Sequence, residues 1–225
     1  MSMSKLVIVT AGGTSEPIDA VRKITNTATG LLGSLVADRL ALRGYVVYYV
    51  APKDAVEPRY VSEMNRIITN DTKSVKEVVC RLLGTENIYA VVHSMAISDY
   101  TVKEVKYHGR VLDNKNKISS DYDELDVKLV KTPKIISLIK KVKPDVKLIG
   151  FKLLDNVSES DLIAASKRQI DVSGSDYVVA NDATWIDGDK HKAIVVNKNG
   201  EVIYRSDGTK RDLAKLIVDR LVIDG

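Results

Sequence analysis

Short, almost wholly apolar runs alternate along most of the chain with amphipathic segments of helical spacing. The runs at 5–10, 45–50 and 88–95 read KLVIVT, YVVYYV and IYAVVHSM, and they lack the regular alternation of polar residues that a half-exposed strand would show. Strands of this kind are buried on both faces, as in parallel sheets covered by helices. The pattern therefore predicts an α/β fold, a Rossmann-like, doubly wound and mostly parallel sheet.

The other segments continue this pattern and then change it. Helix ends are indicated by Gly44 and by Asp71 or Thr72 as a cap. A turn at Asn199-Gly200 predicts a small β-rich extension, a hairpin at about 190–206. The expected helices lie at 31–44, 71–84, 132–142, 158–170 and 209–222, and the further strands at 66–69, 147–154 and 176–182.

The segment from about 101 to 130 is the least regular part of the sequence. It is polar and lysine-rich, and loops of this length in a compact domain are usually lids or disordered. Lys115 and Lys117 fit either an ordinary solvated cluster or a flexible cationic flap that closes over phosphates. Because no Pro/Gly-rich linker divides the chain, we expect 1–225 to be a single domain that carries this flap.

The composition limits the classes of partner. A net charge of +4, with 34 basic and 30 acidic residues intermixed, suits small anions and gives little support for nucleic-acid binding. The single cysteine excludes an internal disulfide, and the three histidines are too scattered for a metal site. No apolar run reaches the roughly 20 residues that span a bilayer, and no signal peptide is recognisable. We expect a cytoplasmic protein without a nucleic-acid or membrane partner.

The most informative motif is TAGGTSEPIDAVRKITNTATG at 10–30, directly after the first strand. Gly12 and Gly13 lie where open α/β sheets bind ligands, which favours a phosphate or nucleotide contact over a plain turn. The end of the motif offers small side chains and backbone N–H groups before a helix, a suitable cradle for an anion. Asn26 fits a ligand contact and a local helix cap equally well.

Polar residues also follow the later strands. Asp99 is suited to ribose hydroxyls, to magnesium on phosphates, or to a helix cap. With Thr132 as a cap and Pro133 as the first helical residue, the free N–H groups and Lys134 would favour a phosphate. The Asn-Asp pair at 181–182 predicts a turn or a ligand contact.

An NAD-dependent enzyme would show a short glycine turn and an acidic residue at the end of the second strand. Here the distance from Gly12 to Gly30 is too long for that turn, and Asp54 comes only after a proline and a lysine. Both features weaken a hydride-transfer function. An NAD(P)- or flavin-binding oxidoreductase and a non-catalytic nucleotide-binding module stay as alternatives.

Together the motifs resemble the phosphopantothenoylcysteine synthetases, also called phosphopantothenate-cysteine ligases, of coenzyme A biosynthesis. Because the chain begins at the ligase's first strand, it is most similar to the stand-alone streptococcal and enterococcal form, and no flavin is expected. The resemblance rests on the motif at 10–30, AISDY at 96–100, NKISS at 116–120, VKTPKII at 130–136, GFKLL at 150–154 and VAND at 179–182.

The resemblance implies a two-step reaction in a homodimer. The carboxylate of 4'-phosphopantothenate attacks the α-phosphate of CTP, which carries Mg²⁺ on its phosphates, and pyrophosphate leaves. L-cysteine then attacks the acyl-cytidylate and releases CMP. Where common bacterial members read FAAET, this chain reads FKLLD at 151–155, more like the ATP-using eukaryotic enzymes. CTP is favoured, and ATP stays open.

The resemblance also implies roles for individual residues. Asn26 would act on the acyl-nucleotide intermediate, and Lys117 of the flap would support its formation. No protein ligand for a metal ion is expected. The residues expected to bind substrate are Arg22, Asn26, Ala28, Thr29 and Gly30. Those expected to bind the nucleotide are Gly12, Gly13, His93, Ser94, Met95, Asp99, Lys117, Lys134, Ile135, Ile136, Ser137, Phe151 and Lys167.

Overall fold

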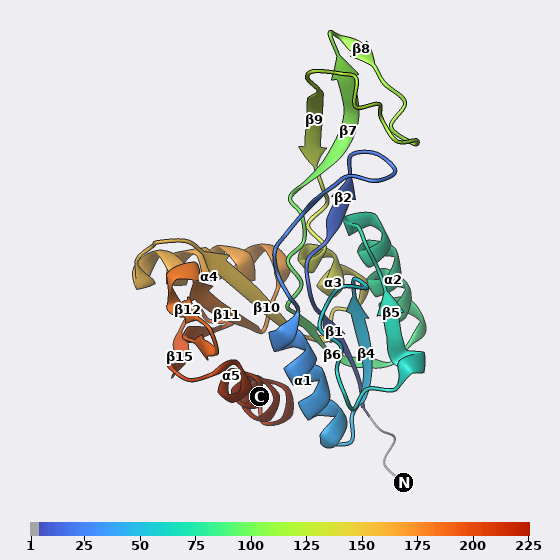
Figure 1. The fold of residues 1–225 in the computed structure, drawn as a ribbon. Helices are drawn as coiled ribbons and strands as arrows, with labels where there is room; N and C mark the ends of the chain where they lie inside the picture. Colours follow the sequence, from blue (N-terminus) through green and yellow to red (C-terminus); the bar gives the residue numbers. More distant parts are fainter. Residues whose placement is uncertain (1–4) are drawn as a thin grey trace.

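An eight-stranded sheet forms the centre of the computed structural model, which describes residues 5–225 (Figure 1). The strand order is β15-β14-β11-β10-β6-β1-β4-β5, and neighbours are parallel except in the pairs β11–β14 and β14–β15. The predicted Rossmann-like, mostly parallel sheet is confirmed. Its strands are β1 (Leu6–Thr10), β4 (Val46–Ala51), β5 (Arg66–Ile68), β6 (Ile88–His93), β10 (Lys147–Leu154), β11 (Tyr177–Asp182), β14 (Ala193–Asn197) and β15 (Val202–Ser206).

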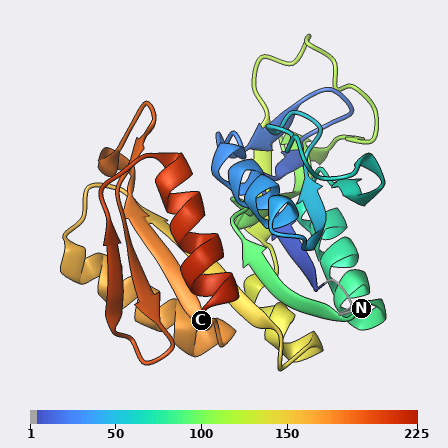
Figure 2. The ribbon, with the colours of Figure 1, turned by 90° about the horizontal axis from the view of Figure 1, so that it is seen from below.

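Helices cover both faces of this sheet, and Figure 2 shows α1 and α5 side by side. Val7 and Val9 of β1 pack in the core under α1 and α5, whereas Ile8 packs in the core under α2 and α3. Burial on both faces explains why the strands are continuously apolar. The helices are α1 (Leu31–Leu42), α2 (Thr72–Thr85), α3 (Ile136–Val142), α4 (Glu159–Ser173) and α5 (Lys210–Leu216), which the π-helical segment η3 (Ile217–Ile223) continues.

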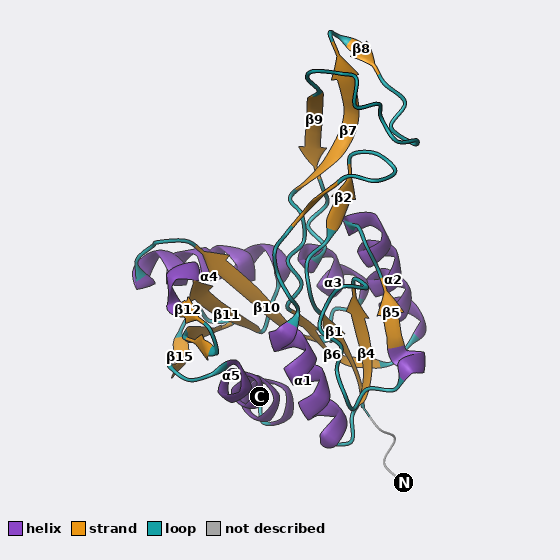
Figure 3. Ribbon diagram, in the orientation of Figure 1, coloured by secondary structure: helices purple, strands orange, loops and turns teal. Residues whose placement is uncertain are grey.

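The segment predicted as a long irregular loop contains a second, antiparallel sheet. Strands β7 (Tyr100–Tyr107), β8 (Arg110–Val111) and β9 (Asp126–Lys131) pair in the order β8-β7-β9 and form an arm that projects from the central sheet (Figures 1 and 3). The prediction of an irregular loop was wrong because VKEVKY and DVKLVK alternate with the period of a strand. Within the arm, only the turn at 108–109 and the loop at 112–125 lie outside its strands.

A second correction concerns α3, which begins at Ile136 rather than at Pro133. Thr132 is not a helix cap, because its N–H donates to the carbonyl of Asp99 (3.0 Å) and its hydroxyl to the carbonyl of Ser98 (2.5 Å). The backbone N–H of Ser137 already donates to Lys134 O (3.1 Å). Fewer free backbone N–H groups are therefore available for a phosphate at the start of α3 than the sequence predicts.

The remaining elements are short. The hairpin predicted at 190–206 is present, and it extends the central sheet as β14 and β15. No helix of the described residues is long and apolar enough to cross a membrane. The short elements are β2 (Ser15–Pro17), β3 (Lys23–Thr25), η1 (Glu63–Asn65), η2 (Ala183–Trp185), β12 (Ile186–Asp187) and β13 (Lys190–His191).

Candidate functional site

The order of strands reverses between β1 and β6. The chain runs outward from β1 to β4 and β5 and returns to β6 on the other side of β1. The carboxyl ends of two such strands border a crevice, which is where open α/β sheets bind ligands. Ser94 follows β6 and ties the two strand ends together, since its N–H and its hydroxyl both donate to the carbonyl of Thr10 (3.2 and 2.7 Å).

Glycines form a narrow cradle on the α1 side of this crevice. Gly12 and Gly30 both have left-handed backbone, with φ of 78° and 80°. A Cβ atom on Gly30 would lie 3.0 Å from the backbone nitrogen of Gly12, so a side chain would close the space. Gly30 is the N-cap of α1 and contributes no side-chain cap, while the first N–H groups of a helix have no partner within it. The cradle is suited to an anion.

Asn26 lies across the β1–β6 junction. Its Nδ2 donates to the carbonyl of Ala96 (2.9 Å) and lies 3.4 Å from the hydroxyl of Ser98. A Cβ on Gly13 would come within 2.8 Å of the carbonyl of Asn26. Asn26 is not the cap of α1, because Gly30 has that position. The side chain of Asn26 is exposed and fixed at the edge of the crevice.

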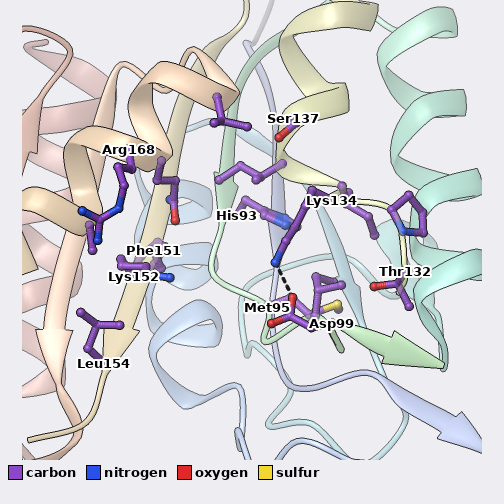
Figure 4. A pocket seen from close by; sticks show the side chains of 17 residues that line it. His93, Met95, Asp99, Thr132, Lys134, Ser137, Phe151, Lys152, Leu154 and Arg168 are labelled. Carbon is purple, nitrogen blue, oxygen red and sulfur yellow. Dashed lines mark hydrogen bonds and ion pairs between the residues drawn. The ribbon is translucent and has the colours of Figure 1, made fainter. Parts of the chain in front are cut away.

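A pocket of about 380 Å³ opens beside the cradle, between the segment leading into α3 and the wall made by β10 and α4 (Figure 4). Its apolar lining includes Met95, Ile135 and Phe151. A cavity with an apolar lining and a few polar groups is typical of a small-molecule site. It brings together the following predicted nucleotide-binding residues: His93, Met95, Asp99, Lys134, Ile135, Ile136, Ser137 and Phe151.

His93 presents one ring nitrogen to this pocket in a fixed state. Its Nδ1 lies 2.9 Å from the hydroxyl of Thr10, which is buried and accepts the N–H of Met95 (3.3 Å). The Thr10 hydroxyl finds an acceptor for its own proton in Nδ1, so we assign the ring proton of His93 to Nε2. Burial lowers the pKa of His93 to about 4, so the ring is neutral at pH 7. The arrangement offers the pocket an N–H donor.

Two further polar atoms beside the pocket have no partner among the described residues. These are the hydroxyl of Ser137 and the amide nitrogen of Gln169, both shielded from solvent. Gly150, which pairs with His93 across β10 and β6, leaves the space for Gln169, because a Cβ there would lie 2.6 Å from Nε2. A buried unpaired polar group costs about 1–3 kcal/mol. A ligand with polar ring atoms would remove that cost.

The charged groups of the pocket are mostly cations. Lys134, Lys152 and Arg168 line it together with one carboxylate, Asp99 (Figure 4). Lys134 forms an ion pair with Asp99, and both side chains are largely exposed. This excess of positive charge suits a ligand that carries phosphates.

Other predicted site residues lie outside this pocket. Lys167 faces the β14–β15 turn, where a Cβ on Gly200 would lie 2.8 Å from Cε. The next residue, Arg168, is on the pocket side, because one residue turns a helix by about 100°. The spacing of 165, 168 and 169 in the helix predicted at 158–170 is the signal for this face, which Val172 continues in α4. Lys117 is exposed on the 112–125 loop.

Arg22 and the Asn-Asp pair of β11 contact protein groups. The guanidinium of Arg22 donates to the carbonyl of Ile118 (2.8 Å). Asp182 accepts from the N–H groups of Val157 and Thr184 (both 2.8 Å), so it organises the chain between strands and helices. Within residues 5–225, no three His, Cys, Asp or Glu side chains are grouped as metal ligands.

Comparisons with known proteins relate the chain to proteins of pantothenate metabolism and coenzyme A biosynthesis. Residues 3–223 match the protein family described as the DNA/pantothenate metabolism flavoprotein C-terminal domain. The chain is 33% identical over 219 residues to the coenzyme A biosynthesis bifunctional protein CoaBC of Thermococcus kodakarensis, covering 96% of this chain and 51% of that protein. The chain thus spans about half the length of this relative.

Two solved structures share the fold over nearly the whole chain. The DNA/pantothenate metabolism flavoprotein from Streptococcus pneumoniae has a TM-score of 0.83 at 35% identity, and the match covers 96% of this chain and 97% of that one. The C-terminal domain of a coenzyme A biosynthesis bifunctional protein CoaBC has a TM-score of 0.76 at 22% identity, covering 98% and 95%. The second likeness concerns the fold alone.

Proposed function

The chain belongs to the DNA/pantothenate metabolism flavoprotein C-terminal domain family, and from this premise we propose that it is a phosphopantothenate-cysteine ligase of coenzyme A biosynthesis. The observation that supports the proposal best is the pocket at the β1–β6 reversal, with its cationic lining and unpartnered polar atoms, next to the glycine cradle. A nucleotide needs both kinds of surface, one for the base and one for the phosphates.

In this proposal the pocket holds the nucleoside. Phe151 supplies an aromatic surface for the base, and the Nε2–H of His93 donates to a ring nitrogen or carbonyl of the base. When the ion pair between Asp99 and Lys134 opens, the Asp99 carboxylate accepts hydrogen bonds from the ribose hydroxyls. The Lys134 ammonium group then binds a phosphate. Phosphate oxygens extend toward the cradle at Gly12 and Gly30, where backbone N–H groups favour anions.

Activation is proposed as the first chemical step. The carboxylate oxygen of 4'-phosphopantothenate forms a bond to the α-phosphorus, and the bond to pyrophosphate breaks. Lys117 stabilises the negative charge on the leaving phosphates. The phosphates carry the Mg²⁺ ion, and Asp99 is the carboxylate that lines the pocket.

Condensation follows. The amine of L-cysteine attacks the acyl carbon, the nucleoside monophosphate leaves with the electron pair of the broken C–O bond, and the amine nitrogen releases one proton to solvent. Asn26, fixed by Ala96 at the edge of the crevice, orients the acyl-nucleotide. The proposal includes a homodimer and no flavin. CTP is favoured as the co-substrate, and ATP is the alternative.

The test is pyrophosphate release by the purified protein with Mg²⁺ and 4'-phosphopantothenate, comparing CTP with ATP, each with and without L-cysteine. We expect release with CTP and complete turnover only when cysteine is present. Release with ATP instead would indicate that the FKLLD segment at 151–155 changes the base preference of the pocket. No release with either nucleotide, despite nucleotide binding, would favour the non-catalytic module.

Two substitutions separate the steps. We expect Lys117→Gln to slow pyrophosphate release by about 100-fold, because the leaving charge loses its cation. Asn26→Ala should give one equivalent of pyrophosphate and then accumulate the acyl-nucleotide, since only the cysteine step is impaired. Rapid quench at single turnover measures both. Normal turnover by either variant would refute its assigned role, and flavin absorbance or nicotinamide binding would favour the oxidoreductase.

A further inference from the structure

The loop that carries Lys117 is almost detached from the rest of the molecule. We call residues 113–125 the lysine segment. Its hydrogen bonds to other parts of the described chain are made by one residue, Ile118, and its other hydrogen bonds are internal. Two looser contacts join it to the arm, an ion pair of Glu124 with His108 (3.6 Å) and the rings of Tyr122 and Tyr107 (4.5 Å apart). The position of Lys117 therefore depends on Ile118.

Both backbone groups of Ile118 are held by the turn after β2. Its N–H donates to Oδ2 of Asp19 (3.1 Å), and its carbonyl accepts from Nη2 of Arg22 (2.8 Å). Ile118 is 4% exposed, whereas Lys117 beside it is exposed. The two holding residues lie more than ninety positions earlier in the chain. Because the N–H and the carbonyl of Ile118 are both hydrogen-bonded, the direction of the neighbouring Lys117 side chain is restricted.

Asp19 is itself firmly placed. Its Oδ1 accepts from the N–H groups of Val21 (2.9 Å) and Arg22 (2.8 Å), and its side chain has no solvent exposure. The hydrogen bond from Val21 is the main reason why the pKa of the Asp19 carboxyl lies below its usual value. Asp19 therefore stays ionised at neutral pH and gives a charge-assisted hydrogen bond to Ile118.

We propose that Asp19 and Arg22 form a latch on the backbone of Ile118, and that Asp19 is a positioning residue that presents Lys117 to the phosphates of the nucleotide. The inference rests on the proposed function for the role of Lys117. The holding of the segment itself rests on the contacts alone. Because the latch belongs to the same 10–30 motif as Asn26, it couples the flap to the crevice.

The first experiment measures the latch without activity. Asp19→Asn keeps an oxygen for Val21 and Arg22, but it turns an amide N–H₂ toward the N–H of Ile118, two donors that repel. Hydrogen exchange by mass spectrometry should show about tenfold faster exchange in 113–125, with the rest of the chain unchanged. Arg22→Gln should give the same local effect. Asp123→Asn, at an exposed position of the same segment, is the matched control and should leave exchange as it is.

The second experiment asks whether the latch acts through Lys117. Single-turnover pyrophosphate release should fall about tenfold in Asp19→Asn, and less than about twofold further when Asp19→Asn is added to Lys117→Ala. An equal loss in both backgrounds would overturn the positioning role, and unchanged exchange in Asp19→Asn would overturn the latch. If the unmodified protein releases no pyrophosphate, the proposed function fails, and exchange alone then decides whether the latch exists.

Discussion

At the scale of single residues, His93 gives the sharpest test of the pocket. His93→Phe keeps an aromatic ring but removes both the Nε2–H donor and the Nδ1 acceptor of the Thr10 hydroxyl, so we expect KM for the nucleotide to rise about tenfold while kcat changes little. Steady-state kinetics with varied nucleotide measure this. His191→Phe is the matched control, because His191 is also buried but does not line the pocket. An unchanged KM in His93→Phe would show that the base lies elsewhere.

Residue identities could be predicted where a motif fixed both type and spacing, and less well elsewhere. His93, Asp99 and Phe151 were predicted for the nucleotide site and do line one pocket. Asp19 and Arg168 were missed, because the first acts on backbone groups of a distant loop and the second depends on the exact rotation of α4. Contacts between segments a hundred residues apart leave no periodic signal in one sequence.

At the scale of elements, Asp182 at the end of β11 holds the loop before α4, and α4 forms one wall of the pocket. Its carboxylate accepts from Asn156 N (3.1 Å), Val157 N (2.8 Å) and Thr184, and so fixes the loop that leads into α4. Asp182→Asn replaces one acceptor oxygen by a donor among N–H groups. We expect the melting temperature to fall by roughly 5 °C and KM for the nucleotide to rise, since α4 forms one wall.

Thermal unfolding followed by circular dichroism measures the first effect of Asp182→Asn. Asp155→Asn is the control for the change of charge, because Asp155 is exposed in the same loop. A melting temperature equal in the two variants would contradict the structural role of Asp182.

The elements themselves were predictable in proportion to how completely they are buried. β1, β6 and the buried part of β10 (148–150) are apolar on both faces, and the predicted bounds of all three strands agree with the structure within a few residues. The strands of the arm were missed because they are half exposed and rich in lysine. Their alternation of polar and apolar residues was therefore taken as the polar composition of a loop. The start of α3 was misplaced because hydrogen bonds from Thr132 to the β6–β7 connection override its tendency to cap a helix.

At the scale of the whole molecule, the features of the proposed site gather at one edge of one sheet. The crevice, the pocket and the latch all lie beyond the carboxyl ends of β1, β6 and β10, whereas the hairpin of β14 and β15 completes the sheet on the far side. The arm extends from this edge and returns to it, and the lysine segment connects β8 to β9 at the outer end of the arm (Figure 1).

The stability of the whole molecule should fall in mild acid. Burial lowers the pKa of both His93 and His191 to about 4, against about 6.5 in an unfolded chain. Between these values the unfolded chain binds more protons than the folded one, so the free energy of unfolding decreases as pH falls from about 6.5 toward 4. Each histidine contributes a loss of up to about 2 kcal/mol at pH 5. The carboxylate of Asp182, whose pKa the Thr184 hydrogen bond lowers to about 2, adds its own loss only at lower pH.

Urea unfolding at pH 7, 6 and 5 measures this dependence directly. His93→Asn is the informative variant, because its side-chain oxygen can still accept from Thr10 while the titrating ring is gone. We expect the slope of the free energy of unfolding against pH to be about half that of the unmodified protein, since His191 is then the one remaining histidine whose pKa burial lowers. A free energy of unfolding that stays constant between pH 7 and pH 5 would mean that both rings protonate freely in the folded state. His93 would then enter the pocket as a cation, and the neutral donor assigned to the base would be lost.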